Sequence, residues 1–190
     1  MRLWNSETSW GWPQRLLHWT VAALVLWQLG LGVWMVNLVE DQLDRFAWTQ
    51  LHKSWGFVVF ALALVRLGWR WANPAVPREP ADLRPWERRA ARASHFALYA
   101  LLLWLPLSGW LMSAASPVQD LLAMENTVFG WFALPDPFVP GVRWISDAFW
   151  WGHTLAALAL AGLLAIHAGA ALRHHFVLRD DVLRRMSWGR

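Results

Sequence analysis

The sequence of 190 residues contains no cysteine and only one lysine. Without thiols, the chain cannot form a disulfide, a thiolate-ligated iron–sulfur cluster, a Cys-ligated haem or a covalently attached c-type haem. Any cofactor must therefore be bound by histidine or by another ligand that is not a thiol. Charged residues are also scarce, at 16% of the chain, whereas 57% of the residues are hydrophobic. This composition is typical of a membrane protein.

Four apolar runs are long enough to cross a bilayer as helices, at about residues 16–36, 48–70, 93–114 and 150–172. Buried helices of a soluble domain would be shorter and more amphipathic. The first run is too long for a signal peptide, and no small-residue cleavage site follows it. We therefore predict that residues 1–190 form a single domain, an all-α, four-transmembrane-helix, up-down-up-down bundle. Residues 116–149 form its long outer loop, in which we expect a short surface helix.

Basic residues are distributed unevenly between the two sides of this predicted bundle. If the N-terminus is cytoplasmic, the inner segments contain fourteen arginines: Arg2, Arg15, seven within residues 66–92 and five within residues 173–190. The outer segments contain three basic residues, Arg45, Lys53 and Arg143. Because cytoplasmic loops of membrane proteins carry the excess of basic residues, both termini are predicted to be cytoplasmic.

Histidines occur at two depths of the predicted bundle. His153 and His167 are fourteen residues apart, which is almost four helical turns, so they lie on nearly the same face, ~21 Å apart along the axis. Helices one and three run outward, which places His18 and His95 near the inner surface with His167. His52 lies near the outer surface with His153. Ionisable groups inside membrane spans are costly and usually functional.

Pairs of histidines at two levels indicate two haems, each with two axial imidazoles. The outer level offers only His52 and His153. At the inner level, His167 can pair with His18 or with His95, and spacing alone favours His18 without excluding His95. Zinc is a competing use of histidine, but it requires clustered His, Cys and carboxylates, whereas these imidazoles are dispersed and no carboxylate lies in a span.

Cations near these histidines are candidates for contacts with haem propionates, for which an Arg fork is well suited. Arg66 is fourteen residues after His52 and Arg70 is one turn further, but both positions also suit positive-inside anchoring. Arg15 near His18 has the same two interpretations. Lys53 can contact an outer propionate or extend to the surface.

Other residues on the predicted ligand faces have two interpretations as well. Gly32 and Gly109 follow His18 and His95 by fourteen residues, and such small residues allow a flat ring or another helix to approach the backbone. His174 lies at the inner surface, as an interfacial residue or as a contact for a quinone or propionate.

Four segments resemble the prokaryotic cytochrome b561 family: residues 12–19 (WPQRLLHW), 51–56 (LHKSWG), 93–99 (ASHFALY) and 166–176 (IHAGAALRHHF). The resemblance covers nearly the whole chain, and the family is similar to the cytochrome b subunits of formate dehydrogenases and nickel–iron hydrogenases. It implies two haems b in the bacterial inner membrane, with His52 and His153 on the outer haem and His18 and His167 on the inner haem. His95 is then a non-ligand near the inner haem, with Tyr99 one turn away.

The resemblance also implies electron transfer between an outer donor and the quinone pool, with ubiquinone or another quinone as substrate. Some family members resemble superoxide oxidases, which pass electrons from superoxide to ubiquinone. The outer segments contain three bases against seven acids: Glu40, Asp41, Asp44, Asp120, Glu125, Asp136 and Asp147. This balance favours a basic donor such as a small c-type cytochrome, although Arg45, Lys53 and Arg143 can form a local funnel for superoxide. A haem-bearing anchor subunit of a larger oxidoreductase is the remaining alternative.

Overall fold

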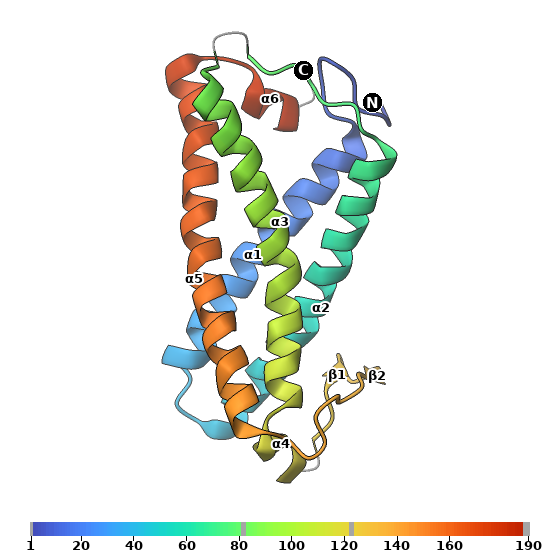
Figure 1. Ribbon diagram of the computed structural model, residues 1–190, viewed down its shortest axis with the longest axis vertical. Helices are drawn as coiled ribbons and strands as arrows, with labels where there is room; N and C mark the ends of the chain where they lie inside the picture. The colour runs from blue at the N-terminus through green and yellow to red at the C-terminus, as the bar shows by residue number, and fades with distance from the viewer. Residues whose placement is uncertain (1, 81–82, 122–123, 188–190) are drawn as a thin grey trace.

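The computed structural model describes residues 2–80, 83–121 and 124–187. Four long helices form a bundle (Figure 1): α1 (Trp12–Asn37), α2 (Gln42–Ala72), α3 (Pro85–Ala114) and α5 (Arg143–Arg173). Each is long and apolar enough to cross a membrane. The last span continues into a π-helical segment, η1 (His174–Leu178). This architecture confirms the predicted bundle of four membrane helices.

The helices begin before the apolar runs that predicted them because polar and proline residues define their first turns. Asp41 precedes α2, and its side chain accepts hydrogen bonds from the backbone N–H groups of Leu43 and Asp44. Glu87 in the first turn of α3 accepts from the backbone N–H of Arg84. Such capping satisfies N–H groups that have no partner within a helix. The capped helices are therefore longer than the apolar runs within them.

Both termini lie at the same end of the bundle, which we call the inner end (Figure 1). Helices α1 and α2, α2 and α3, and α3 and α5 contact one another. A small apolar core lies between them, formed by Val21, Val25, Val59, Ala63, Leu102 and Leu160. Many large apolar side chains on the long helices are instead exposed, such as Leu26 and Leu158. This distribution suits a protein whose outer surface contacts lipid.

Helix α3 continues through Pro106. Its two halves run in different directions (Figure 1). A proline inside a helix removes one backbone hydrogen bond and favours such a bend.

The outer cap, residues 117–121 and 124–142, connects α3 to α5 at the other end. It contains the short helix α4 (Pro117–Leu121) and a hairpin of β1 (Thr127–Val128) and β2 (Phe132–Ala133). Three residues separate the paired Val128 and Phe132. Phe129 and Gly130 have positive φ angles of 51° and 72°, as the two central residues of a type I′ turn require, and the backbone N–H of Trp131 donates to the carbonyl of Val128. The sequence predicted the short helix but not the hairpin.

The inner end is covered by α6 (Val182–Ser187), which crosses the bundle beside the N-terminal segment (Figure 1). Arg15 Nη1 donates to the carbonyl of Ser187 at 3.3 Å, and Trp19 Nε1 donates to that of Met186 at 3.1 Å. These bonds attach the C-terminal segment to the first turns of α1. Arg190, one of the predicted inner arginines, lies outside the described residues.

Candidate haem sites at two levels of the bundle

At the outer level, His52 of α2 faces His153 of α5. Their ring centroids are 6.3 Å apart, and the ring planes are inclined by 77°. A metal bound between two imidazoles, with metal–nitrogen bonds of about 2 Å, places the ring centres roughly 6 Å apart. The outer pair therefore has the separation that a bis-histidine iron requires.

The ring of His153 is oriented by α3. Its Nδ1 lies 3.0 Å from the carbonyl oxygen of Leu105 and 3.1 Å from Oγ of the buried Ser108. Because a carbonyl can only accept, Nδ1 carries the proton and donates it to Leu105, which leaves the Nε2 lone pair free for a metal. A hydrogen bond from the second ring nitrogen to a carbonyl is the usual support for a metal-bound histidine.

Glycines lie beside both outer rings, as the fourteen-residue spacing suggested. A Cβ atom at Gly109 would lie 3.2 Å from Cε1 of His153, and one at Gly32 would lie 3.6 Å from Cε1 of His52. At Gly109 a side chain would press on the ring, so this glycine is needed for the close approach of α3 and α5. His52 Nδ1 is buried without a hydrogen-bond partner among the described residues.

At the inner level, the structure brings together His18 of α1, His95 of α3 and His167 of α5. The centroids of His18 and His167 are 6.2 Å apart, whereas those of His95 and His167 are 5.4 Å apart. The first separation matches that of the outer pair, and the second is shorter. The geometry therefore favours His18 over His95 as the partner of His167.

Arg66 reaches the inner level from α2, as its spacing from His52 predicted. Its Nη2 donates to Nδ1 of His18 at 2.9 Å, and its guanidinium lies 5.3 Å from the centre of the Tyr99 ring. A guanidinium has no acceptor, so Nδ1 of His18 accepts, and in a neutral imidazole the proton is then on Nε2. For Nε2 to bind iron, this proton would have to move to Nδ1, and the hydrogen bond from Arg66 would be lost.

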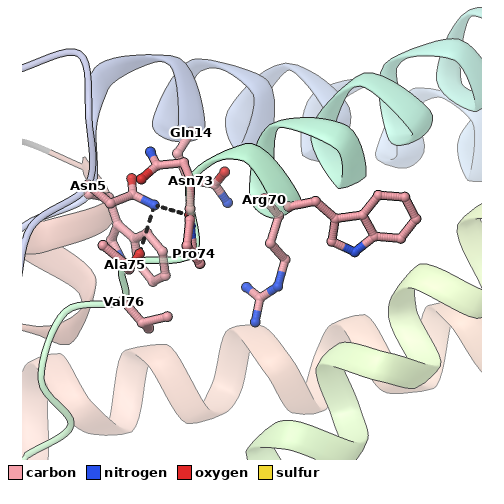
Figure 2. Close-up of a pocket in the computed structure, with 9 residues that line it drawn as sticks. Asn5, Gln14, Arg70, Asn73, Pro74, Ala75 and Val76 are labelled. Atoms are coloured by element: carbon pink, nitrogen blue, oxygen red, sulfur yellow. Dashed lines mark hydrogen bonds between the residues drawn. The ribbon is translucent and has the colours of Figure 1, made fainter.

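The other predicted contacts lie at the two ends of the bundle. Lys53 Nζ donates to Asn126 Oδ1 at 2.9 Å and to Ser113 Oγ at 3.2 Å. It therefore joins α2 to α3 and to the outer cap rather than extending to the surface. At the inner end, His174 Nδ1 lies 2.5 Å from a carboxylate oxygen of Asp180, and the exposed Arg70 lines a cavity (Figure 2).

The outer cap is attached to α2 directly beside His52. Asn126, which holds Lys53, donates to Asp136 at 2.6 Å. The backbone N–H of Phe129 donates to Ser54 Oγ at 2.9 Å, and its ring packs edge-on against Trp55 at 5.5 Å. These contacts fix the hairpin over the outer end of the ligand helix.

Sequence reasoning missed Ser108 and the Lys53–Asn126–Asp136 network. One sequence feature could have indicated Ser108, because it is a hydroxyl residue inside an apolar run and next to Gly109. The network joins three segments that no local sequence pattern connects. In residues 2–80, 83–121 and 124–187, no group of three or more His, Cys, Asp or Glu side chains could hold a metal ion. The zinc alternative therefore has no site in this part of the chain.

A bundle of four membrane helices with imidazoles paired between facing helices is the architecture of a b-type membrane cytochrome. The family model for prokaryotic cytochrome b561 matches residues 9–189. The chain therefore belongs to the prokaryotic cytochrome b561 family, as the resemblance implied, and is a membrane electron-transfer protein that binds haem b.

Three relatives illustrate this membership. The chain is 32% identical over 190 residues to cytochrome b561 homolog 2 of Escherichia coli K12. The matched region covers 98% of this chain and 95% of the relative. It is 34% identical over 140 residues to cytochrome b561 homolog 1 of the same organism, at 72% and 73% coverage. It is also 26% identical over 180 residues to the probable superoxide oxidase CybB of Yersinia pestis, at 90% coverage of each.

Proposed function

We propose that this protein binds two haems b and passes electrons between an outer donor and the quinone pool. His52 and His153 ligate the outer haem, and His18 and His167 ligate the inner haem. The observation that carries the proposal is the equal separation of the two ring pairs, 6.3 Å and 6.2 Å. In this proposal residues 1–190 are one domain of the bacterial inner membrane, with both termini cytoplasmic.

Each residue of the proposed sites has a defined task. When bound, a haem iron supplies reversible one-electron chemistry. With two imidazoles as its protein ligands, a bound haem would support electron transfer rather than dioxygen activation. Leu105 and Ser108 hold the ring of His153 in its binding orientation, whereas Arg66 supplies positive charge beside His18. His95, Tyr99 and His174 are candidates for contacts with the quinone or the inner haem.

The outer donor is a basic c-type cytochrome in our preferred version. The outer segments contain seven acids and three bases, and opposite charge steers a protein donor to its site. Two bases of the suggested superoxide funnel are held by neutral groups, Arg45 by the carbonyl of Val39 and Lys53 by Asn126. The third, Arg143, is exposed and lies 3.9 Å from Asp147. A superoxide oxidase is the second candidate, supported by the name of the Yersinia relative.

The proposal is tested by counting and titrating the haems of the purified protein. A pyridine haemochrome assay should give two haems b per chain, and a redox titration should resolve two one-electron transitions. One haem or none per chain would contradict it. Stopped-flow mixing with superoxide then separates an oxidase, whose haem is reduced rapidly, from a carrier that requires a protein donor. Co-purification of a partner in equal amount would instead indicate an anchor subunit.

A further inference from the structure

A cavity of about 310 Å³ lies between the inner ends of α1 and α2 (Figure 2). Its walls come from four segments: the residues before α1, the first turn of α1, the end of α2 and the extended chain that follows α2. They include the amides of Asn5, Gln14 and Asn73 and the guanidinium of Arg70. The other lining residues are apolar or aromatic, namely Trp10, Trp71, Pro74, Ala75 and Val76. The cavity thus presents three amides and one cation within a largely apolar wall.

Two polar atoms of this wall are buried without a partner in the described residues. Gln14 and Asn73 are only 2% and 5% exposed, and the unpaired atoms are Oε1 of Gln14 and Nδ2 of Asn73. Buried polar groups in proteins are nearly always hydrogen-bonded, so two exceptions in one wall require an explanation. A ligand that supplies the missing partners would provide it.

Both polar atoms of the Asn5 side chain are hydrogen-bonded, and these bonds hold the wall in place. Its Nδ2 donates to the carbonyls of Ala75, at 3.0 Å, and Asn73, at 3.4 Å, while its Oδ1 accepts from the backbone N–H of Gly11 at 2.9 Å (Figure 2). The N-terminal segment is therefore fixed against the end of α2, and the unpaired amides of Gln14 and Asn73 are not free to pair with it.

The pocket lies one helical turn inward of the inner histidines. Gln14 is four residues before His18 and Arg70 is four residues after Arg66, so each lies below its partner on the same helix face, by ~6 Å. Arg66 itself contacts His18 at 2.9 Å. A flat cofactor held at His18 would extend one edge toward the inner surface along these two faces.

We propose that this pocket receives a propionate of the inner haem, an inference that rests on the inner haem of the proposed function. The carboxylate takes its counter-charge from Arg70 and a hydrogen bond from Asn73 Nδ2. Rotation of the Gln14 amide by half a turn replaces its unpaired acceptor with a second donor. A propionate thus satisfies both buried amides, and it does so with one cation and no neighbouring carboxylate among the lining residues.

Infrared difference spectroscopy of the complete protein tests this assignment. Cells supplied with 5-aminolevulinate carrying ¹³C at its carboxyl group produce haem with labelled propionates. Redox difference spectra then identify the propionate bands by their isotope shift. Asn73→Leu and Arg70→Gln should displace labelled bands and lower the midpoint potential of the inner haem. Loss of the cation or of the donor leaves more uncompensated negative charge at the propionate, which disfavours adding an electron to the haem. Arg70→Lys should stay close to wild type.

Two further variants make the test decisive. Asn37→Leu makes the same substitution at an exposed amide, which donates to Val33 within α1 at the outer end, and should leave labelled bands and both potentials unchanged. If Asn73→Leu does not accumulate, the nearly isosteric Gln14→Glu places a second carboxylate in the pocket and should lower the inner potential more than any neutral change.

The possible failures are distinguishable. Fewer than two haems per wild-type chain contradicts the proposed function itself. Two haems, with bands and inner potential unaffected by Asn73→Leu, Arg70→Gln and Gln14→Glu, overturns only the pocket assignment. A phospholipid phosphate would use the same donors. Loss of a bound phospholipid in native mass spectra of Arg70→Gln, with unchanged propionate bands, would also overturn the assignment.

Discussion

The outer and inner histidine pairs have nearly equal ring separations but different surroundings. At the outer level, Leu105 and Ser108 fix the ring of His153, and Gly109 packs against it. At the inner level, a third histidine competes for the same partner, and Arg66 donates to His18. The ring of His153 therefore already has its Nε2 lone pair free for a metal, whereas at His18 the proton would have to move from Nε2 to Nδ1, with loss of the bond from Arg66. In the proposed arrangement, the inner site would therefore have to rearrange more than the outer site on binding iron.

The largest expected effect separates the two levels completely. His52→Ala or His153→Ala should remove the outer haem and retain the inner one, because no other histidine among the described residues lies at that depth. Pyridine haemochrome content should fall from two haems to one, and the redox titration should lose one transition. Retention of both haems in either variant would show that the outer pairing is wrong.

A pair of substitutions tests whether His18 or His95 is the partner of His167 at the inner level. His18→Ala should abolish the inner low-spin haem, whereas His95→Ala should retain both haems, because His95 is too close to His167 to share an iron with it. Low-temperature electron paramagnetic resonance distinguishes the two results. The reverse pattern, with haem lost only in His95→Ala, would assign His95 as the ligand.

A smaller change sharpens the comparison at the outer ring. Gly109→Ala places a methyl group 3.2 Å from Cε1 of His153, so the ring must tilt and its bond to Leu105 must weaken. We expect a shift of the outer midpoint potential of up to about 60 mV, a tenfold change in a one-electron equilibrium. The inner potential should not change. Gly162→Ala on α5 is the matched control, since no atom lies within 4 Å of its added methyl.

The smallest effect concerns the donor at the outer face. Reduction of the outer haem by a basic cytochrome should slow as salt rises, because screening at ~0.1 M acts over ~10 Å. Arg143→Glu alters an exposed cation outside the cap network and should accelerate this donor roughly twofold at low salt. Lys53→Glu tests the funnel directly. Fast reduction by superoxide that Lys53→Glu abolishes would identify superoxide as the donor, provided Lys53→Arg retains it.

Periodicity predicted the depth of each histidine because a helix converts sequence spacing into height and direction. The spacing of fourteen residues from His153 to His167 was sufficient to place these two histidines at different depths on one helix face. Other features depend on contacts between distant segments. Spacing could not choose between His18 and His95, because the choice depends on how far apart α1, α3 and α5 pack. The hairpin turn at Phe129 was not predicted because a bulky residue rarely adopts positive φ. Ser108 and Asn126 became functional candidates only when α3 and the cap met α5 and α2.

The position of both proposed α5 ligands on one uninterrupted helix has an electrical consequence. Their ~21 Å separation is about two thirds of a hydrocarbon layer ~30 Å thick. Moving one charge across the whole membrane involves ~2.3 kcal/mol per 100 mV, so an electron passing between the two levels works with or against ~1.5 kcal/mol per 100 mV. In a cell whose interior is negative, inward electron flow is opposed and outward flow is assisted. In the proposed two-haem arrangement, helix α5 would thereby set how strongly membrane voltage biases the direction of electron transfer.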